Sequence, residues 1–190
     1  MIDKRALRQL RLKNEYDEMI KYSNDVIRVE PLGGSPHDKY RITFNIRTII
    51  SSKPEYRNKT VCILTIPPEY PKIRPKIAVI GSSMPPPWHV NWFSSGTWCE
   101  GSWRSDEPLV NFIYRCAKTI QFDPAFTQAS YVDSANRGAI SFWNANKNNY
   151  KVIPCDKKKI PTFAEIQRIT IHQNSLQKIS VFSRGNKNRG

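Results

Sequence analysis

Apolar and polar residues alternate in several segments of the chain's first half, which is the pattern of half-buried β-strands. The two clearest segments are Tyr40–Arg47 and Thr60–Ile66, and the second is rich in β-branched side chains. Shorter candidates lie at Val26–Glu30 and Lys76–Ile80, and Ser51–Asn58 reads as a loop. Because the connections are short, we expect the four strands to form an antiparallel meander in chain order.

Helical spacing of apolar residues predicts three helices around this sheet. The first spans residues 3–22, with Asp3 as its N-cap. Its apolar face can cover the sheet and consists of Ala6, Leu7, Leu10, Tyr16, Met19 and Ile20. The second spans Leu109–Ile120 and ends before Asp123-Pro124, and the third spans Ser130–Asn146. The expected fold class is therefore α+β, a four-stranded antiparallel meander with flanking helices.

Residues 81–108 carry little regular pattern but hold four of the five tryptophans. A loop of this length in a compact domain is usually functional or disordered. Its aromatic content argues against disorder, so we expect a functional loop here.

That loop contains His89-Val90-Asn91, followed by Cys99 eight residues after the asparagine. Upstream, Tyr70-Pro71-Lys72-Ile73-Arg74-Pro75 forms a proline-punctuated bend. A thiol can carry an acyl group as a thioester, and an asparagine amide can donate to the oxyanion that forms when an amine attacks. We therefore predict a catalytic set of Cys99, Asn91 and His89, in which His89 braces the loop rather than acting as a base.

The other cysteines do not point to chemistry. Cys62 lies in an alternating strand and Cys116 on a helical face, so both are expected to be buried, while Cys155 lies in a polar connector without an evident role. Their spacing is irregular and includes no Cys-x-x-Cys pair. The sequence thus predicts no disulfide framework, no metal site and no cofactor.

The order of these features resembles a ubiquitin-conjugating enzyme over residues 1–150. Members of that family carry His-Pro-Asn before the active cysteine, whereas this chain has Val90 in place of the proline. Gly96, a tryptophan after the cysteine (Trp103) and Asp123-Pro124 also fit the family pattern. The divergence resembles the bacterial members, which act in ubiquitin-like conjugation pathways.

The resemblance implies a function and a set of partners. Cys99 would accept a ubiquitin-like protein from an activating enzyme and pass it to an amine of a protein substrate. A deconjugating protease encoded nearby would be a further partner. The activating enzyme would dock on the basic face of the first helix, which carries Lys4, Arg5, Arg8 and Arg11.

The net charge of +14 is concentrated at the two ends of the chain. Residues 151–190 hold nine Lys/Arg against two Asp/Glu, a balance of +7, and the first 13 residues hold five against one, a balance of +4. We therefore divide the chain into a catalytic domain, residues 1–150, and a basic extension, residues 151–190. Alternation at Glu165–Ile171 and Gln177–Phe182 makes the extension either a β-hairpin or a disordered tail.

Three other functions compete with conjugation. A non-catalytic binding module, of the RWD kind, can use the same scaffold, and the basic tail can bind nucleic acid. A cysteine protease would need a histidine to activate Cys99, and the chain offers only His37, His89 and His172. No run of 18 apolar residues and no secretory core is present, so we expect a cytoplasmic protein without membrane contact.

Overall fold

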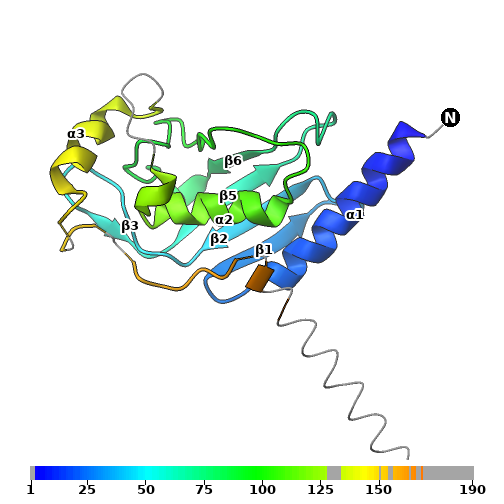
Figure 1. The fold of residues 1–190 in the computed structure, drawn as a ribbon, viewed down its shortest axis with the longest axis horizontal. Coiled ribbons are helices and arrows are strands. Elements are labelled where there is room, and N and C mark those ends of the chain that lie inside the picture. Colours follow the sequence, from blue (N-terminus) through cyan, green and yellow to red (C-terminus); the bar gives the residue numbers. More distant parts are fainter. Residues whose placement is uncertain are drawn as a thin grey trace, which may run out of the picture. The chain divides into compact units, whose positions relative to one another are not determined.

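The computed structural model describes residues 3–127, 134–149, 151–153, 156–162, 164, 165 and 168. The chain divides into one compact unit that ends at Ile160 and a second that begins at Pro161. The first unit contains a four-stranded antiparallel sheet in the order β1-β2-β5-β6 (Figure 1). Its strands are β1 (Ile27–Leu32), β2 (Lys39–Phe44), β5 (Thr60–Thr65) and β6 (Lys76–Val79). The predicted meander is confirmed, although β2 ends three residues earlier than expected.

The register of the sheet builds its apolar face. Val29, Ile42, Cys62 and Val79 lie opposite one another across the four strands, and all four are buried. Because side chains alternate along a strand, this row faces the core. Each fully buried aliphatic side chain contributes about 1.5–3 kcal/mol to folding. Burial also raises the pKa of the Cys62 thiol, so this cysteine stays protonated and inert.

Helix α2 (Leu109–Ile120) lies over the sheet (Figure 1). Eight of its twelve residues are buried: Leu109, Val110, Phe112, Ile113, Cys116, Ala117, Thr119 and Ile120. Burial raises the pKa of the Cys116 thiol, and neighbouring Cys62 of β5 adds to that shift. The predicted bounds of this helix are confirmed, and α2 lies over the sheet while the first helix contacts β1 and α2.

Helix α1 (Lys4–Tyr22) begins as expected, because the Asp3 side chain accepts a hydrogen bond from the Arg5 N–H at 2.8 Å. The helix ends at Ser23, whose N–H bonds to the carbonyls of Met19 and Ile20. The Asn24 side chain then accepts from the N–H groups of Val26 and Ile27, which turns the chain into β1.

The predicted apolar face of α1 is largely wrong, although Met19 is buried as expected. The helix buries Leu12, Glu15, Met19 and Tyr22, whereas Leu7, Leu10 and Ile20 are 51%, 57% and 38% exposed. The first turns of α1 extend beyond the sheet (Figure 1). The apolar residues of these first turns have no part of the sheet to pack against. The buried residues begin only at Leu12, and they define the face of the helix that packs on the core.

A second, smaller core lies beside the sheet. Within the expected loop at residues 51–58, β4 (Tyr56–Arg57) pairs with β3 (Thr48–Ile49). The Arg47 guanidinium lies over the Tyr56 ring at 3.9 Å. The second core consists of Ile49, Val90, Phe122, Ala139, Ile140, Trp143 and Ile153. It therefore joins the β3–β4 ribbon, the loop that contains Val90 and the third helix.

That helix, α3 (Arg137–Asn146), is shorter than predicted. Asn136 is its N-cap and accepts a hydrogen bond from the Ala139 N–H at 3.2 Å. Ser134, Ala135 and Asn136 are not helical, because the Asn136 side chain starts the helix where it satisfies the first free N–H groups. Residues 130–133 of the expected helix lie outside the described residues.

Part of the basic extension belongs to the first unit. Ile153 and Ile160 are buried, and the Asp156 carboxylate accepts hydrogen bonds from the N–H groups of Arg47 and Lys158. In the second unit, Thr162 and Glu165 form a reciprocal capping box. Ala164, Glu165 and Arg168 are helical, so the strand expected from Glu165 does not start there, and residues 177–182 lie outside the described residues.

The elements of the first unit meet at Glu15, a carboxylate that is 2% exposed. It accepts hydrogen bonds from Arg11 Nε and the Tyr70 hydroxyl, both at 2.6 Å, and from the Leu109 N–H at 2.8 Å. Pro108, the residue before α2, offers no capping side chain. A carboxylate on α1 therefore caps the positive end of α2 and binds the bend at Tyr70.

Replacement of Glu15 tests this junction. Glu15→Ala leaves the Arg11 guanidinium, the Tyr70 hydroxyl and the Leu109 N–H without their acceptor, so we expect the free energy of unfolding in urea to fall by about 3 kcal/mol. Asp17→Ala is the control, because the Lys13–Asp17 pair on the same helix is exposed. Its removal should cost about 0.5 kcal/mol or less. Equal losses for the two variants would contradict the role of Glu15.

Candidate active site

The segment that carries Cys99 is a small hairpin. Trp92 pairs with Trp98, and the Phe93 N–H donates to the Thr97 carbonyl at 2.9 Å. One step further along the hairpin, the Cys99 N–H donates to the Asn91 carbonyl at 2.7 Å. The two residues that the sequence singled out are therefore neighbours across the hairpin.

This hairpin is hydrogen-bonded to the edge of β6 that does not pair with β5. The Val79 N–H donates to the Gly96 carbonyl at 2.9 Å, and the Trp98 N–H donates to the Ile77 carbonyl at 3.0 Å. Gly96 has a φ of +90°, and a Cβ there would lie 3.3 Å from the Val79 carbonyl oxygen. Only glycine satisfies both the turn and this close approach, so Gly96 is a structural requirement for placing Cys99.

His89 connects the hairpin to the segment that follows α2. Its Nδ1 accepts the Asn91 N–H at 3.1 Å, so Nε2 carries the proton and donates to Thr127 Oγ1, also at 3.1 Å. The Thr127 hydroxyl in turn donates to the Asp123 carbonyl at 2.8 Å. The imidazole is 1% exposed, and burial lowers its pKa to about 3. It is therefore neutral at physiological pH, with both nitrogens occupied by the fold.

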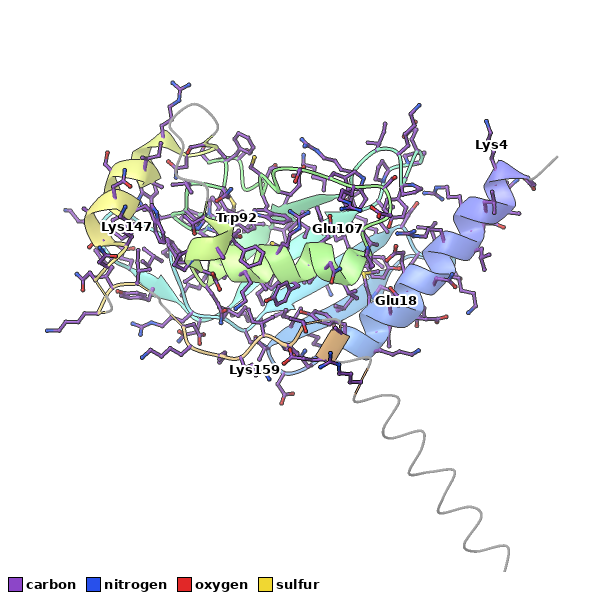
Figure 2. All side chains as sticks on the ribbon, in the orientation of Figure 1. Lys4, Glu18, Trp92, Glu107, Lys147 and Lys159 are labelled. Carbon is purple, nitrogen blue, oxygen red and sulfur yellow. The ribbon has the colours of Figure 1, made fainter. Side chains whose placement is uncertain are left out.

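Val90, which replaces the family's proline, anchors the same loop in the second core. Its side chain is 1% exposed, and its carbonyl accepts the Asn136 N–H at 3.2 Å. Trp92 anchors the other side, because it is fully buried and its indole N–H donates to Thr119 Oγ1 of α2 at 3.3 Å (Figure 2). Asn91 thus lies between two buried anchors.

Cys99 differs from the two other described cysteines, since it is partly exposed while Cys62 and Cys116 are buried. It opens into a pocket of about 250 Å³ that also includes Asn91. The remaining lining residues are Trp98, Glu100, Gly101, Ser102, Arg115, Thr119, Ala125 and Phe126. Cys99 and Asn91 therefore line the same pocket, in which Cys99 is partly exposed and Asn91 is 7% exposed.

The residues after Cys99 are held in place by an ion pair and by Trp103. Arg74 of the proline bend pairs with Glu100 at 2.5 Å. The Trp103 indole N–H donates to the Pro71 carbonyl at 2.9 Å, and its ring lies 5.9 Å from that of Tyr70. The bend at Tyr70–Pro75 therefore supports the cysteine segment directly.

The four basic residues expected to meet a partner do not form one free surface. Arg11 is bound to Glu15, to the Tyr70 hydroxyl and to the Glu107 carbonyl, and Arg8 donates to the Pro67 carbonyl at 3.3 Å. Lys4 and Arg5 are exposed, and Lys4 lies at the outer end of α1 (Figure 2). Of the four predicted residues, only Lys4 and Arg5 in the first turn of α1 are therefore exposed.

Sequence reasoning missed Glu15, Thr127 and Arg115. Glu15 shares the helical spacing of buried Leu12 and Met19, which is the one signal that could have revealed it. Nothing local distinguishes Thr127. Arg115 lies between apolar residues of α2, where a charged side chain must find partners.

No family model matches the chain, and no curated protein matches it. Among solved structures, the chain is similar to a Plasmodium vivax ubiquitin conjugating enzyme E2, with a TM-score of 0.47 and 12% identity. The overlap covers 58% of this chain and 98% of that chain. No role for any residue follows from this overlap. None of the helices in the described part of the chain is long and apolar enough to cross a membrane.

The buried neutral state of His89 predicts a pH dependence of stability. The pKa of His89 is about 3 in the folded protein and about 6.5 when unfolded, so the unfolded chain binds the extra proton between these values. The stabilisation is present above pH 6.5 and is lost as the pH falls toward 3. We expect the difference in unfolding free energy between the protein and His89→Gln to shrink by about 1–2 kcal/mol from pH 7 to pH 5. A constant difference in urea titrations would show that His89 is not held neutral.

Proposed function

We propose that this protein is a ubiquitin-conjugating-like acyl carrier that holds a ubiquitin-like protein as a thioester on Cys99. The observation that supports it best is the pairing of Asn91 and Cys99 across the hairpin, in one pocket, with Cys99 partly exposed. A carrier thiol of this kind belongs in a reducing cytoplasm, where free cysteines persist. A bacterial conjugation pathway with its own deconjugating protease is the setting that the sequence resemblance suggests.

The proposed reaction has two half-reactions. In the first, the Cys99 thiol loses its proton and attacks the thioester of an activating enzyme, which leaves as its own thiol. In the second, an amine attacks the acyl carbon, and the resulting oxyanion accepts a hydrogen bond from the Asn91 side-chain amide. The intermediate then expels the Cys99 thiolate, the nitrogen loses a proton, and an amide bond remains.

The geometry of His89 speaks against the protease alternative. A protease would need an imidazole that takes the proton of Cys99. His89 uses Nδ1 to accept the Asn91 N–H and Nε2 to contact Thr127, and its low pKa makes it a poor base. His37 packs against the Tyr16 ring of α1, and His172 lies outside the described residues.

The two non-enzymatic alternatives differ in what supports them. A binding module on this scaffold has no need of a partly exposed thiol beside an asparagine, so Cys99 favours the carrier. Nucleic-acid binding rests on the charge of residues 151–190, and a strong loss of affinity with added salt would support it.

Replacing Cys99 tests the thioester. With ATP, a cognate activating enzyme and its ubiquitin-like protein, we expect an adduct that thiols cleave, and Cys99→Ala should abolish it because no sulfur remains to form the bond. Cys62→Ala and Cys116→Ala are the controls and should still form the adduct, because both thiols are buried. Non-reducing gel electrophoresis gives the readout. An adduct that survives Cys99→Ala would refute the assignment.

Asn91 should matter in the second half-reaction only. Asn91→Ala keeps the backbone carbonyl that binds the Cys99 N–H, so charging should persist. Discharge of the preformed thioester to free lysine should slow by about 10²–10³-fold, the usual cost of losing an oxyanion donor. Rapid-quench measurement of the discharge rate checks this. A normal rate would leave Asn91 a structural residue, with its amide irrelevant to the reaction.

We further propose that the first turn of α1 docks the activating enzyme through an acidic surface on that partner. Lys4 and Arg5 are exposed there, next to exposed Leu7 and Leu10. Charge of this kind mainly raises the association rate and is screened by salt. Arg8 and Arg11 bind within the fold, so they are poor test positions.

Charge reversal at this turn provides the test. The double variant Lys4→Glu and Arg5→Glu should slow charging of Cys99 most strongly at low salt, with discharge of preformed thioester unchanged. Lys53→Glu with Lys147→Glu changes the net charge equally at exposed positions elsewhere and is the control. Stopped-flow charging kinetics as a function of salt give the readout. Equal slowing by both pairs would mean that net charge, and not this turn, attracts the partner.

A further inference from the structure

Arg115 of α2 binds the backbone on both sides of Gly101, directly after Cys99. Its Nη1 donates to the Glu100 carbonyl at 2.7 Å, and its Nη2 donates to the Ser102 carbonyl at 3.3 Å. One guanidinium therefore holds two carbonyls that are separated by a single residue.

The guanidinium is itself fixed. Its Nε and Nη2 bind the two oxygens of Glu107, each at 2.9 Å, in a bidentate ion pair. Glu107 lies at the N-terminal end of α2 (Figure 2), and the guanidinium carbon lies 5.7 Å from the centre of the Trp98 ring. The two charged side chains are only 22% and 14% exposed. Desolvation offsets much of the attraction in such a pair, so the pair adds little to the free energy of folding. Its presence therefore needs another explanation.

Gly101, between the two bound carbonyls, is the flexible point that the clamp restrains. Its φ is +73°, in the left-handed region, and without a side chain its flanking peptide units turn easily. On the other side of the cysteine, the Cys99 N–H is bound to the Asn91 carbonyl. Cys99 is thus held from one side by Asn91 and from the other by Arg115, and release of either side frees the thiol to move relative to the Asn91 amide.

Arg115 also lines the pocket into which Cys99 opens, as a residue that positions Cys99 should. Arg115 and Ser102 line the Cys99 pocket of about 250 Å³ and also an adjoining hollow of about 420 Å³. The clamp therefore forms part of the wall of the space into which the thiol opens.

We propose that Arg115 is a positioning residue for acyl transfer, which sets the Cys99 sulfur against Asn91 by clamping the carbonyls of Glu100 and Ser102. This inference rests on the proposed carrier function. Lysine cannot replace arginine here, because one ammonium cannot span two carbonyls and a carboxylate. A small displacement of reacting groups is enough to cost about 10²-fold in rate.

Arg115→Lys tests the clamp while keeping the charge. Arg104→Lys is the matched control, because Arg104 lies in the same segment, is 78% exposed and pairs with Asp106. Two readouts are compared at a temperature the same number of degrees below the melting temperature of each variant. The first is hydrogen exchange of the Cys99 backbone amide by NMR, which needs no partner. The second is single-turnover discharge of preformed thioester to lysine over a range of lysine concentrations.

In Arg115→Lys we expect faster exchange at Cys99 and a maximal discharge rate lower by about 10–100-fold. The lysine concentration at half-maximal rate should be unchanged, since lysine does not bind Arg115. Millimolar guanidinium should partly restore discharge by Arg115→Ala, and Arg104→Lys should match the unmodified protein in both readouts.

The outcomes separate cleanly. Unchanged protection of the Cys99 amide, or lost protection with a normal discharge rate, would overturn the proposal. A shift in half-maximal lysine concentration alone would also overturn it, because Arg115 would then bind the acceptor. Failure of the unmodified protein to form any thioester would refute the carrier function instead, and the exchange measurement would still decide whether Arg115 clamps Cys99.

Discussion

The hydrogen-bonded carboxylate of Glu15 is the constraint on which the rest of the first unit depends. It connects α1 to α2, because this side chain of α1 accepts the Leu109 N–H at the start of α2. The same carboxylate also binds Arg11 and the Tyr70 hydroxyl. The position of α2 then fixes Thr119, which binds Trp92, and Arg115, which binds the residues after Cys99. A buried carboxylate far along the sequence from the cysteine therefore contributes to the placement of the cysteine segment.

A second chain of contacts reaches the same segment from the other side. Asp123, Thr127 and His89 are linked by hydrogen bonds that end on the Asn91 N–H. Val90 adds an apolar contact with the second core. Histidine fits here because a neutral imidazole accepts with one nitrogen and donates with the other. Its role as a link between two segments explains why it can be buried with both ring nitrogens occupied.

The sequence predicts those elements of the fold whose causes lie within the element itself. The bounds of α2 follow from strict apolar spacing between Pro108 and the Asp123-Pro124 break, so they were predictable. The strands β2 and β5 were predictable for the same reason, through their alternation. The face of α1 was not, since it depends on how far the helix extends beyond the sheet.

The candidate site divides in the same way. The order of Asn91, Gly96 and Cys99 along the sequence predicts one site through its resemblance to a family pattern, and the hairpin that places Asn91 opposite Cys99 was not predicted. The sequence signals of Glu15 and Arg115, which are their positions among the apolar residues of a helix, do not reveal their partners, because those partners lie on other elements. The pairing of β3 with β4 joins neighbouring segments, but strands of two residues each are too short to show alternation in the sequence. Contacts between distant segments are what the sequence pattern leaves open.

The division of the apolar interior into two clusters has a thermal consequence. The second core is held by α3, by two strands of two residues each and by Ile153. Such small units open at lower free-energy cost than a four-stranded sheet. Asn91 is tied to this core through Val90, while Cys99 is tied to β6 through Trp98. Opening of the second core would loosen the loop at Val90 while the sheet remained folded, so the geometry around Asn91 would change below the melting temperature of the fold.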